Sequence, residues 1–131
     1  MDDEECLREA IVQFFTTMGL TAMGAEDGFA ALSQAVLHAP AVLVVDLTMP
    51  RMSGEQLCEE LRRRMSPTPP VILMSGDPAG PSRAAALRPY RFFPKPIDLE
   101  ALLGCVRGAL DAESDARTRR SAGENHEQDS L

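Results

Sequence analysis

The stretch VLVVDLTMPRMSG, residues 42–54, places a single carboxylate at the end of a short apolar segment. The β-branched run 42–45 is typical of a strand that is buried on both faces in a parallel sheet. Asp46 ends this run, and because an unpaired buried charge is costly, we expect cations or hydrogen-bond donors around it. Pro50 and Gly54 predict a loop directly afterwards. An Asp that only caps a helix or forms a turn is the competing interpretation, and the rest of the chain disfavours it.

The composition indicates one globular domain. The chain has 131 residues, which suffice for a self-contained core, and with five Phe, one Tyr and no Trp that core must be aliphatic. The net charge of −7 disfavours nucleic acid and anionic membranes as direct partners. The sequence shows neither a signal peptide nor an apolar run long enough to span a bilayer, so we expect a cytoplasmic protein.

The cysteines and histidines give little indication of chemistry. Cys6, Cys58 and Cys105 are odd in number, lack CxxC spacing and fall in helical patterns. We therefore expect reduced, partly buried thiols. His38 and His126 lie far apart in the sequence and have no metal-ligating companions. Neither is predicted to serve in catalysis or in metal binding.

Hydrophobic periodicity predicts strands that alternate with helices. Helices are expected at 4–18, 29–39, 54–65, 82–87 and from 98 onward, and strands at 20–23, 42–45, 71–74 and 91–93. This alternation is typical of a parallel sheet with right-handed crossovers and helices on both faces. We expect the domain to span residues 1–110. The polar residues 111–131 have almost nothing to bury and are predicted to form a disordered tail.

Polar side chains gather at the predicted strand ends. Asp2 and Asp3 precede the first helix, whereas Asp46, Ser75 and Lys95 each follow a strand. In a parallel sheet all of these project at one edge. Three close carboxylates repel one another unless a hard divalent cation such as Mg²⁺ joins them, and a hydroxyl and an ammonium bind phosphoryl oxygens. The set predicts phosphoryl transfer to Asp46 as the nucleophile.

On these residues the chain resembles the receiver domain of two-component response regulators, from residue 2 to about residue 110. The resemblance rests on four motifs in order, each at a strand end: DDEE (2–5), DLTMPRMSG (46–54), VILMSGD (71–77) and FFPKPID (92–98). It implies a flavodoxin-like, doubly wound parallel α/β sheet with helices on both faces.

The resemblance implies a phosphoacceptor and a metal site. Asp46 would take a phosphoryl group from a phosphohistidine on a histidine kinase or a histidine phosphotransfer protein. Mg²⁺ would be held by Asp3 and Asp46, by the backbone carbonyl of Thr48, and by Asp2 through water. The domain would act as a signalling module through protein–protein contact and not as an enzyme.

Three further roles follow from the same resemblance. Ser75 would bind a phosphoryl oxygen, and Lys95 would pair with the phosphorylated Asp46. Phe92 stands at the family's aromatic switch position without the hydroxyl that is often found there. Plain core packing is the alternative interpretation of Phe92, because a buried aromatic ring needs no further function.

Two features depart from the family pattern. Receivers carry an apolar strand of about five residues before the acidic pair, and only Met1 stands there; a start assigned too late is one explanation. Because that strand is central in the order 2-1-3-4-5, we expect a sheet truncated at its first strand, marginal stability and weak Mg²⁺ affinity. The segment between Ser75 and Lys95 is also short and contains Arg88-Pro89, so we expect a short or irregular fourth helix.

Other classes of protein fit the residues less well or stay open. A phosphatase of the haloacid dehalogenase type needs an acid two residues after its nucleophile, where this chain has Thr48. A flavin-binding flavodoxin needs a Ser/Thr/Gly-rich phosphate loop, which follows none of the strands. A degenerate or truncated receiver that binds partners without phosphorylation remains an alternative. The sequence is also compatible with both a stand-alone receiver and the terminal receiver of a larger phosphorelay protein.

Overall fold

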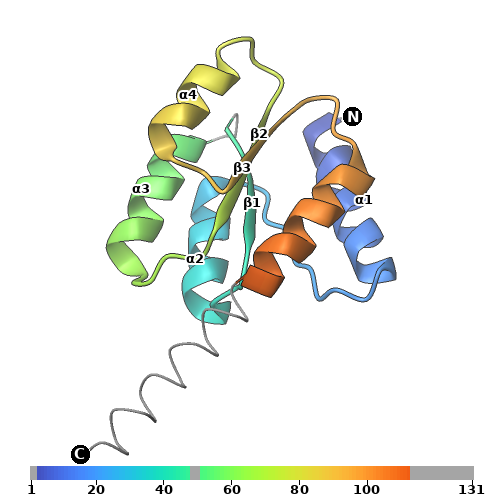
Figure 1. Cartoon of the computed structure of the whole chain (residues 1–131). Coiled ribbons are helices and arrows are strands. Elements are labelled where there is room, and N and C mark those ends of the chain that lie inside the picture. Colours follow the sequence, from blue (N-terminus) through green and yellow to red (C-terminus); the bar gives the residue numbers. More distant parts are fainter. Residues whose placement is uncertain (1–2, 48–50, 113–131) are drawn as a thin grey trace, which may run out of the picture.

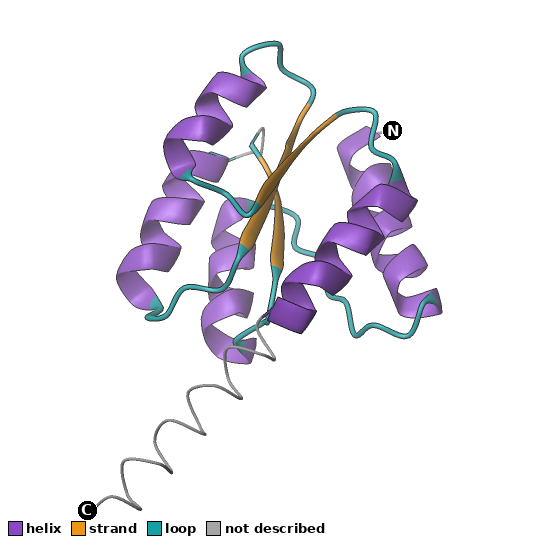
Figure 2. Ribbon diagram, in the orientation of Figure 1, coloured by secondary structure: helices purple, strands orange, loops and turns teal. Residues whose placement is uncertain are grey.

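A parallel three-stranded sheet separates two layers of helices in the computed structural model of the chain, which describes residues 3–47 and 51–112 (Figures 1 and 2). The strands are β1 (Leu43–Asp46), β2 (Val71–Ser75) and β3 (Arg91–Pro94). The helices are α1 (Asp3–Thr17), α2 (Gly28–His38), α3 (Gly54–Arg64), α4 (Gly80–Leu87) and a last helix at residues 99–112.

The sheet order is β1-β2-β3, and both strand pairs are parallel. Asp46 lies opposite Met74, and Ser75 lies opposite Pro94, so the carboxyl ends of all three strands meet at one edge. α1 and the last helix lie on one side of the sheet, whereas α2, α3 and α4 lie on the other (Figure 1). This is the predicted α/β arrangement with helices on both faces.

Side-chain caps start three of the helices where the sequence favours them. Asp27 accepts a hydrogen bond from a backbone N–H in the first turn of α2 at 2.9 Å. Ser53 and Gln56 form a reciprocal capping box at the start of α3. Asp98 accepts from two backbone N–H groups of the last helix, as predicted from its place before an apolar helical face. These caps fix where the loops at the carboxyl edge end.

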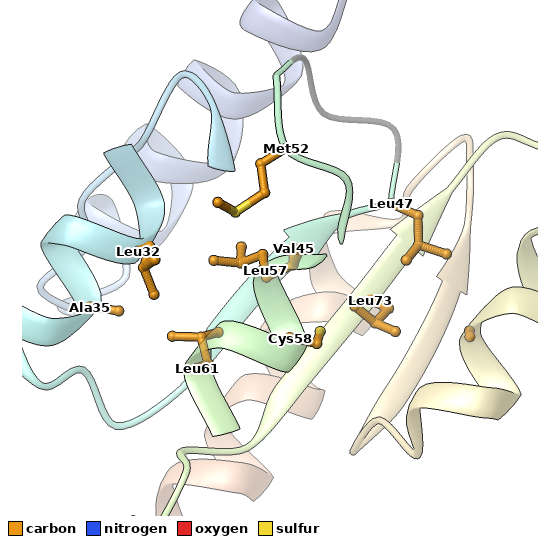
Figure 3. Close-up of a cluster of buried hydrophobic side chains, with 10 residues drawn as sticks. Leu32, Ala35, Val45, Leu47, Met52, Leu57, Cys58, Leu61 and Leu73 are labelled. Carbon is orange, nitrogen blue, oxygen red and sulfur yellow. The ribbon is translucent and has the colours of Figure 1, made fainter. Parts of the chain in front are cut away.

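Two aliphatic clusters hold the layers together. Between the sheet and α2, α3 and α4 lie Leu32, Ala35, Val45, Leu47, Met52, Leu57, Cys58, Leu61, Leu73 and Ala84 (Figure 3). On the other face lie Ile11, Phe15, Ile72, Met74, Leu102, Leu103 and Val106. Phe15 is the one aromatic ring in these two sets, which confirms the aliphatic core expected from the composition.

The predicted strand at 20–23 is wrong. Residues 20–25 belong to no helix or strand and pair with no part of the sheet that the structure describes. β1 is therefore an edge strand, and Val44 on it is only half-buried, whereas we expected burial on both faces. Among the described residues no strand lies between residues 20–25 and β1, and an extended segment without a ladder partner forms no sheet.

A groove with a volume of about 700 Å³ lies between α1, the extended segment 20–25 and β1. Its walls include Leu7 and Ile11 of α1, Leu20 and Ala22 of the extended segment, and Val44 of β1. The backbone N–H groups of residues 43 and 47 donate to carbonyls on the β2 side. Because peptide groups alternate along a strand, those of residues 42 and 44 face the groove.

The remaining expectations concern α4, the thiols and the chain end. α4 is short, as predicted, although it begins at residue 80 and not at residue 82. All three cysteines are free; Cys58 is buried and Cys105 half-buried, but Cys6 is exposed. The last helix includes residues 111 and 112, and the rest of the predicted tail lies outside the described residues. Within the described ranges, no helix has the length and apolar character needed to cross a membrane.

Candidate functional site

An ion pair stands at the carboxyl edge of the sheet. Asp46 is the last residue of β1, and its Oδ2 lies 2.5 Å from the Lys95 Nζ. The Asp46 side chain is 13% exposed and that of Lys95 22% exposed, so most of the pair is shielded from solvent. Charge-assisted hydrogen bonds of this length are strong and orient both groups. The cation that the buried charge of Asp46 requires is therefore supplied by the residue after β3.

Ser75 lies on β2, between the strands that lead to Asp46 and Lys95. It ends β2 with 2% exposure, and its carbonyl accepts a hydrogen bond from the backbone N–H of Lys95 at 2.9 Å. The Ser75 hydroxyl oxygen accepts from the backbone N–H of Asp77 at 3.0 Å. A hydroxyl has one donor and two acceptor positions, so this bond leaves its hydrogen available for a bound anion.

Two glycines bring helices close to the site. A Cβ at Gly54, the first residue of α3, would lie 2.8 Å from the Leu47 Cα. A Cβ at Gly80, the first residue of α4, would lie 2.9 Å from the Ser75 Cβ. Both distances are shorter than a real Cβ contact, so only glycine allows these two helices to start directly against the ends of β1 and β2.

Phe92 lies on β3 beside the same helix start. Its ring is half-buried and packs against the cluster between the sheet and α2, α3 and α4. A Cβ at Gly80 would lie 3.2 Å from the Phe92 Cζ. The ring thus adjoins the start of α4, next to Ser75, and this position agrees with both the switch interpretation and plain core packing.

The predicted metal ligands are only partly described. Asp3 is the first residue of α1 and does not precede it, and α1 starts at the end of the molecule where the strands' carboxyl ends lie (Figure 1). Asp2 and Thr48 lie outside the described residues. The described residues contain no cluster of three His, Cys, Asp or Glu side chains. The Mg²⁺ site therefore stays a prediction.

The comparisons with known proteins agree with this geometry. The profile of the response regulator receiver domain matches residues 1–107. The chain belongs to the receiver-domain family. A curated relative, the response regulator MprA of Mycobacterium avium, is 33% identical in an alignment of 127 positions that covers 90% of this chain and 55% of the relative. The chain thus spans about half the length of the curated relatives it matches.

Solved structures show the same flavodoxin-like fold. NtrX from Brucella abortus is similar with a TM-score of 0.80 at 24% identity, over 92% of this chain and 28% of NtrX. The receiver domain of the Francisella response regulator 1452 has a TM-score of 0.75 at 25% identity, over 85% of this chain and 93% of that domain. As a receiver domain, the chain is a phosphoacceptor module of two-component signalling.

The sequence interpretation missed one member of this receiver's carboxyl edge. Arg83 on α4 donates from Nε and Nη2 to the two carboxylate oxygens of Glu55 on α3, at 2.7 and 2.6 Å. This hydrogen bond holds the pKa of Glu55 below its usual value and raises that of Arg83. The two residues are 28 positions apart, and no local pattern connects them.

Proposed function

We propose that this receiver accepts a phosphoryl group on Asp46 from the phosphohistidine of a histidine kinase or histidine phosphotransfer protein. The observation that carries the proposal is the Asp46–Lys95 ion pair at the carboxyl edge, with the Ser75 hydroxyl on the adjoining strand. The proposal extends to a domain of residues 1–110 that acts by protein–protein contact in the cytoplasm. The family supports this role, and the histidine donor matches the chemistry of a carboxylate nucleophile.

The proposed transfer replaces a P–N bond with a P–O bond. A carboxylate oxygen of Asp46 attacks the phosphorus, an acyl phosphate P–O bond forms, and the P–N bond to the imidazole breaks with its electron pair on the leaving nitrogen. Lys95 holds the carboxylate before the step and pairs with the phosphoryl oxygens after it. The Ser75 hydroxyl donates to one of these oxygens. In such transfers catalysis consists mostly of positioning and charge neutralisation.

The donor chemistry of this edge fits Mg²⁺. Carboxylates are hard oxygen ligands, which this ion prefers, and the described side chain of Asp46 supplies one at the end of β1. Asp3 and Asp46 would bind Mg²⁺ directly, Asp2 through water, and Thr48 through its carbonyl oxygen. When bound, the ion neutralises charge on the phosphoryl group. Among the described residues, Lys95 orients the Asp46 carboxylate through the ion pair.

The test is labelling of the wild-type chain and of Asp46→Asn. Wild type is expected to acquire an acid- and alkali-labile phosphoryl group from a kinase panel and from acetyl phosphate. Asp46→Asn is expected to acquire none, because an amide is no nucleophile and is a poorer metal ligand. Asp98→Asn is the matched control, since Asn caps a helix about as well as Asp and this residue lies outside the ion pair.

The outcomes separate the two candidate functions. Full labelling of Asp46→Asn would mean that another residue is the phosphoacceptor. A folded wild-type chain that takes no label from any donor would favour the alternative, a receiver that binds partners without phosphorylation. In that case Asp46 would serve only as the structural partner of Lys95.

A further inference from the structure

One guanidinium connects the two segments that follow Asp46 and Ser75. Besides its bonds to Glu55, the Nη2 of Arg83 donates to the carbonyl oxygen of Leu47 at 3.3 Å. Leu47 is the residue directly after Asp46, and it is 1% exposed. Its carbonyl also accepts from the backbone N–H at the start of α3, at 3.3 Å. Arg83 therefore reaches the backbone carbonyl of the residue directly after the phosphoacceptor.

The other arm of the same guanidinium reaches the segment after β2. Nη1 of Arg83 donates to the Asp77 Oδ2 at 3.4 Å. Asp77 donates its backbone N–H to the Ser75 hydroxyl, and its Oδ1 accepts from the backbone N–H of Ala79 at 2.9 Å. Arg83 is thus two hydrogen bonds away from the Ser75 hydroxyl on one side and one bond away from the peptide that follows β1 on the other.

This arrangement differs from an ordinary surface ion pair. The Arg83 and Glu55 side chains are 30% and 37% exposed, and they join two helices that start at the site. By contrast, Arg63 and Glu60 pair along the surface of α3 alone, with Arg63 70% exposed. A bidentate arginine–carboxylate pair fixes direction as well as distance, which a lysine in the same place does not do.

We propose that Arg83 is a positioning residue for phosphorylation of Asp46. Through Glu55 and the Leu47 carbonyl it holds the start of α3 and the residue directly after Asp46, and through Asp77 it holds the turn that orients the Ser75 hydroxyl. Small misplacements of reacting groups slow a transfer that depends on alignment. The proposal rests on the proposed phosphoacceptor role, and it assigns no contact between Arg83 and the phosphoryl group.

The test compares Arg83→Gln, Arg83→Lys and Glu55→Gln with Arg63→Gln as the matched control. The labelling rate is measured over a range of acetyl phosphate concentrations, which separates the maximal rate from the affinity for the donor. Arg83→Gln and Arg83→Lys are expected to lower the maximal rate about tenfold at unchanged donor affinity, because the planar fork is lost in both. Arg63→Gln is expected to match wild type.

Two further readouts keep the proposal falsifiable. The double variant Glu55→Gln/Arg83→Gln is expected to be no slower than Arg83→Gln, since Glu55 acts through its contact with Arg83. Amide hydrogen exchange is expected to quicken at Gly54 and Asp77 in Arg83→Gln, but not in Arg63→Gln. Wild-type rates and exchange in Arg83→Gln would overturn the proposal, and so would wild-type rates in Arg83→Lys.

These readouts also distinguish the two proposals. If wild type takes no label, the phosphoacceptor role fails, whereas exchange at Gly54 and Asp77 still decides whether Arg83 fixes the two segments. If wild type is labelled and the Arg83 variants are labelled equally fast, only the positioning role fails. Glu55→Gln provides a milder change in case Arg83→Gln does not fold.

Discussion

Filling the groove beside β1 with a strand is expected to stabilise the domain. The change is an added segment of five apolar β-forming residues directly before Met1. α1 starts at the carboxyl edge, so a segment that leads into it along the groove would run parallel to β1 (Figure 1). Its peptide groups would meet those of Val42 and Val44, and its side chains would meet the apolar walls of the groove.

The expected gain in unfolding free energy is the sum of side-chain burial and new hydrogen bonds, less the cost of ordering the added residues. Burial of an apolar side chain contributes about 2 kcal/mol, and a new backbone hydrogen bond contributes about 1 kcal/mol. Ordering one residue costs about 2 kcal/mol for backbone and side chain together. With five side chains and about three new hydrogen bonds, the net gain in unfolding free energy is about 3 kcal/mol. For a domain of this size that raises Tm by roughly 10 °C.

The assay is thermal melting followed by circular dichroism, with Mg²⁺ affinity measured by calorimetric titration. Mg²⁺ affinity is expected to rise together with Tm, because the added strand anchors Asp2 and Asp3. An extension of five Gly and Ser residues is the control. A second control is the same apolar peptide added to the chain as a separate molecule. Equal gains from the polar extension would refute the reasoning. So would a chain that already melts cooperatively at high temperature as a monomer with ordinary Mg²⁺ affinity.

Three further predictions concern single residues. Lys95→Ala is expected to leave Mg²⁺ binding largely intact in calorimetry. It is expected to abolish the phosphorylation-dependent changes in amide chemical shifts, because the Lys95 ammonium would pair with the phosphoryl group on Asp46. Leu61→Ala, at a fully buried position between α2, α3 and the sheet, is expected to lower the unfolding free energy by about 2–5 kcal/mol in urea titrations. The hydrogen bond from Arg83 lowers the pKa of Glu55 in the folded state. The ionised carboxylate therefore stabilises the fold above the pKa of the unfolded chain, and this stabilisation is lost as pH falls through the folded-state pKa. The urea midpoint of Glu55→Gln is therefore expected to change less between about pH 7 and about pH 3 than that of wild type, and an equal change in both would contradict it.

The sequence predicted the three observed strands and the members of the ion pair because these depend on local patterns. The runs 42–45 and 71–74 are apolar and contain β-branched residues, and each is followed by a polar residue that the parallel register then brings to one edge. The pairing of Asp46 with Lys95 follows from that register. For the same reason the strand ends could be predicted within a residue or two from the chain alone.

What the sequence did not predict depends on contacts between distant segments. Residues 20–23 have the composition of a strand, but a strand also needs a neighbour, and the groove separates this segment from β1. Val44 is half-exposed for the same reason. The bond between Arg83 and Glu55 arises because two glycine-led helices start next to each other, which no spacing in the sequence reveals.

The outer edge of β3 determines how the sheet meets other molecules. β3 is four residues long, begins at the exposed Arg91 and ends at Pro94, with Pro96 close behind. Short length, an exposed charge and proline are features that prevent an edge strand from templating the strands of neighbouring copies. Fibre-like stacking through β3 is therefore blocked by the chain's own residues. Within the described residues, the edge of the sheet that lacks the exposed charge and the proline is that of β1, which faces the groove.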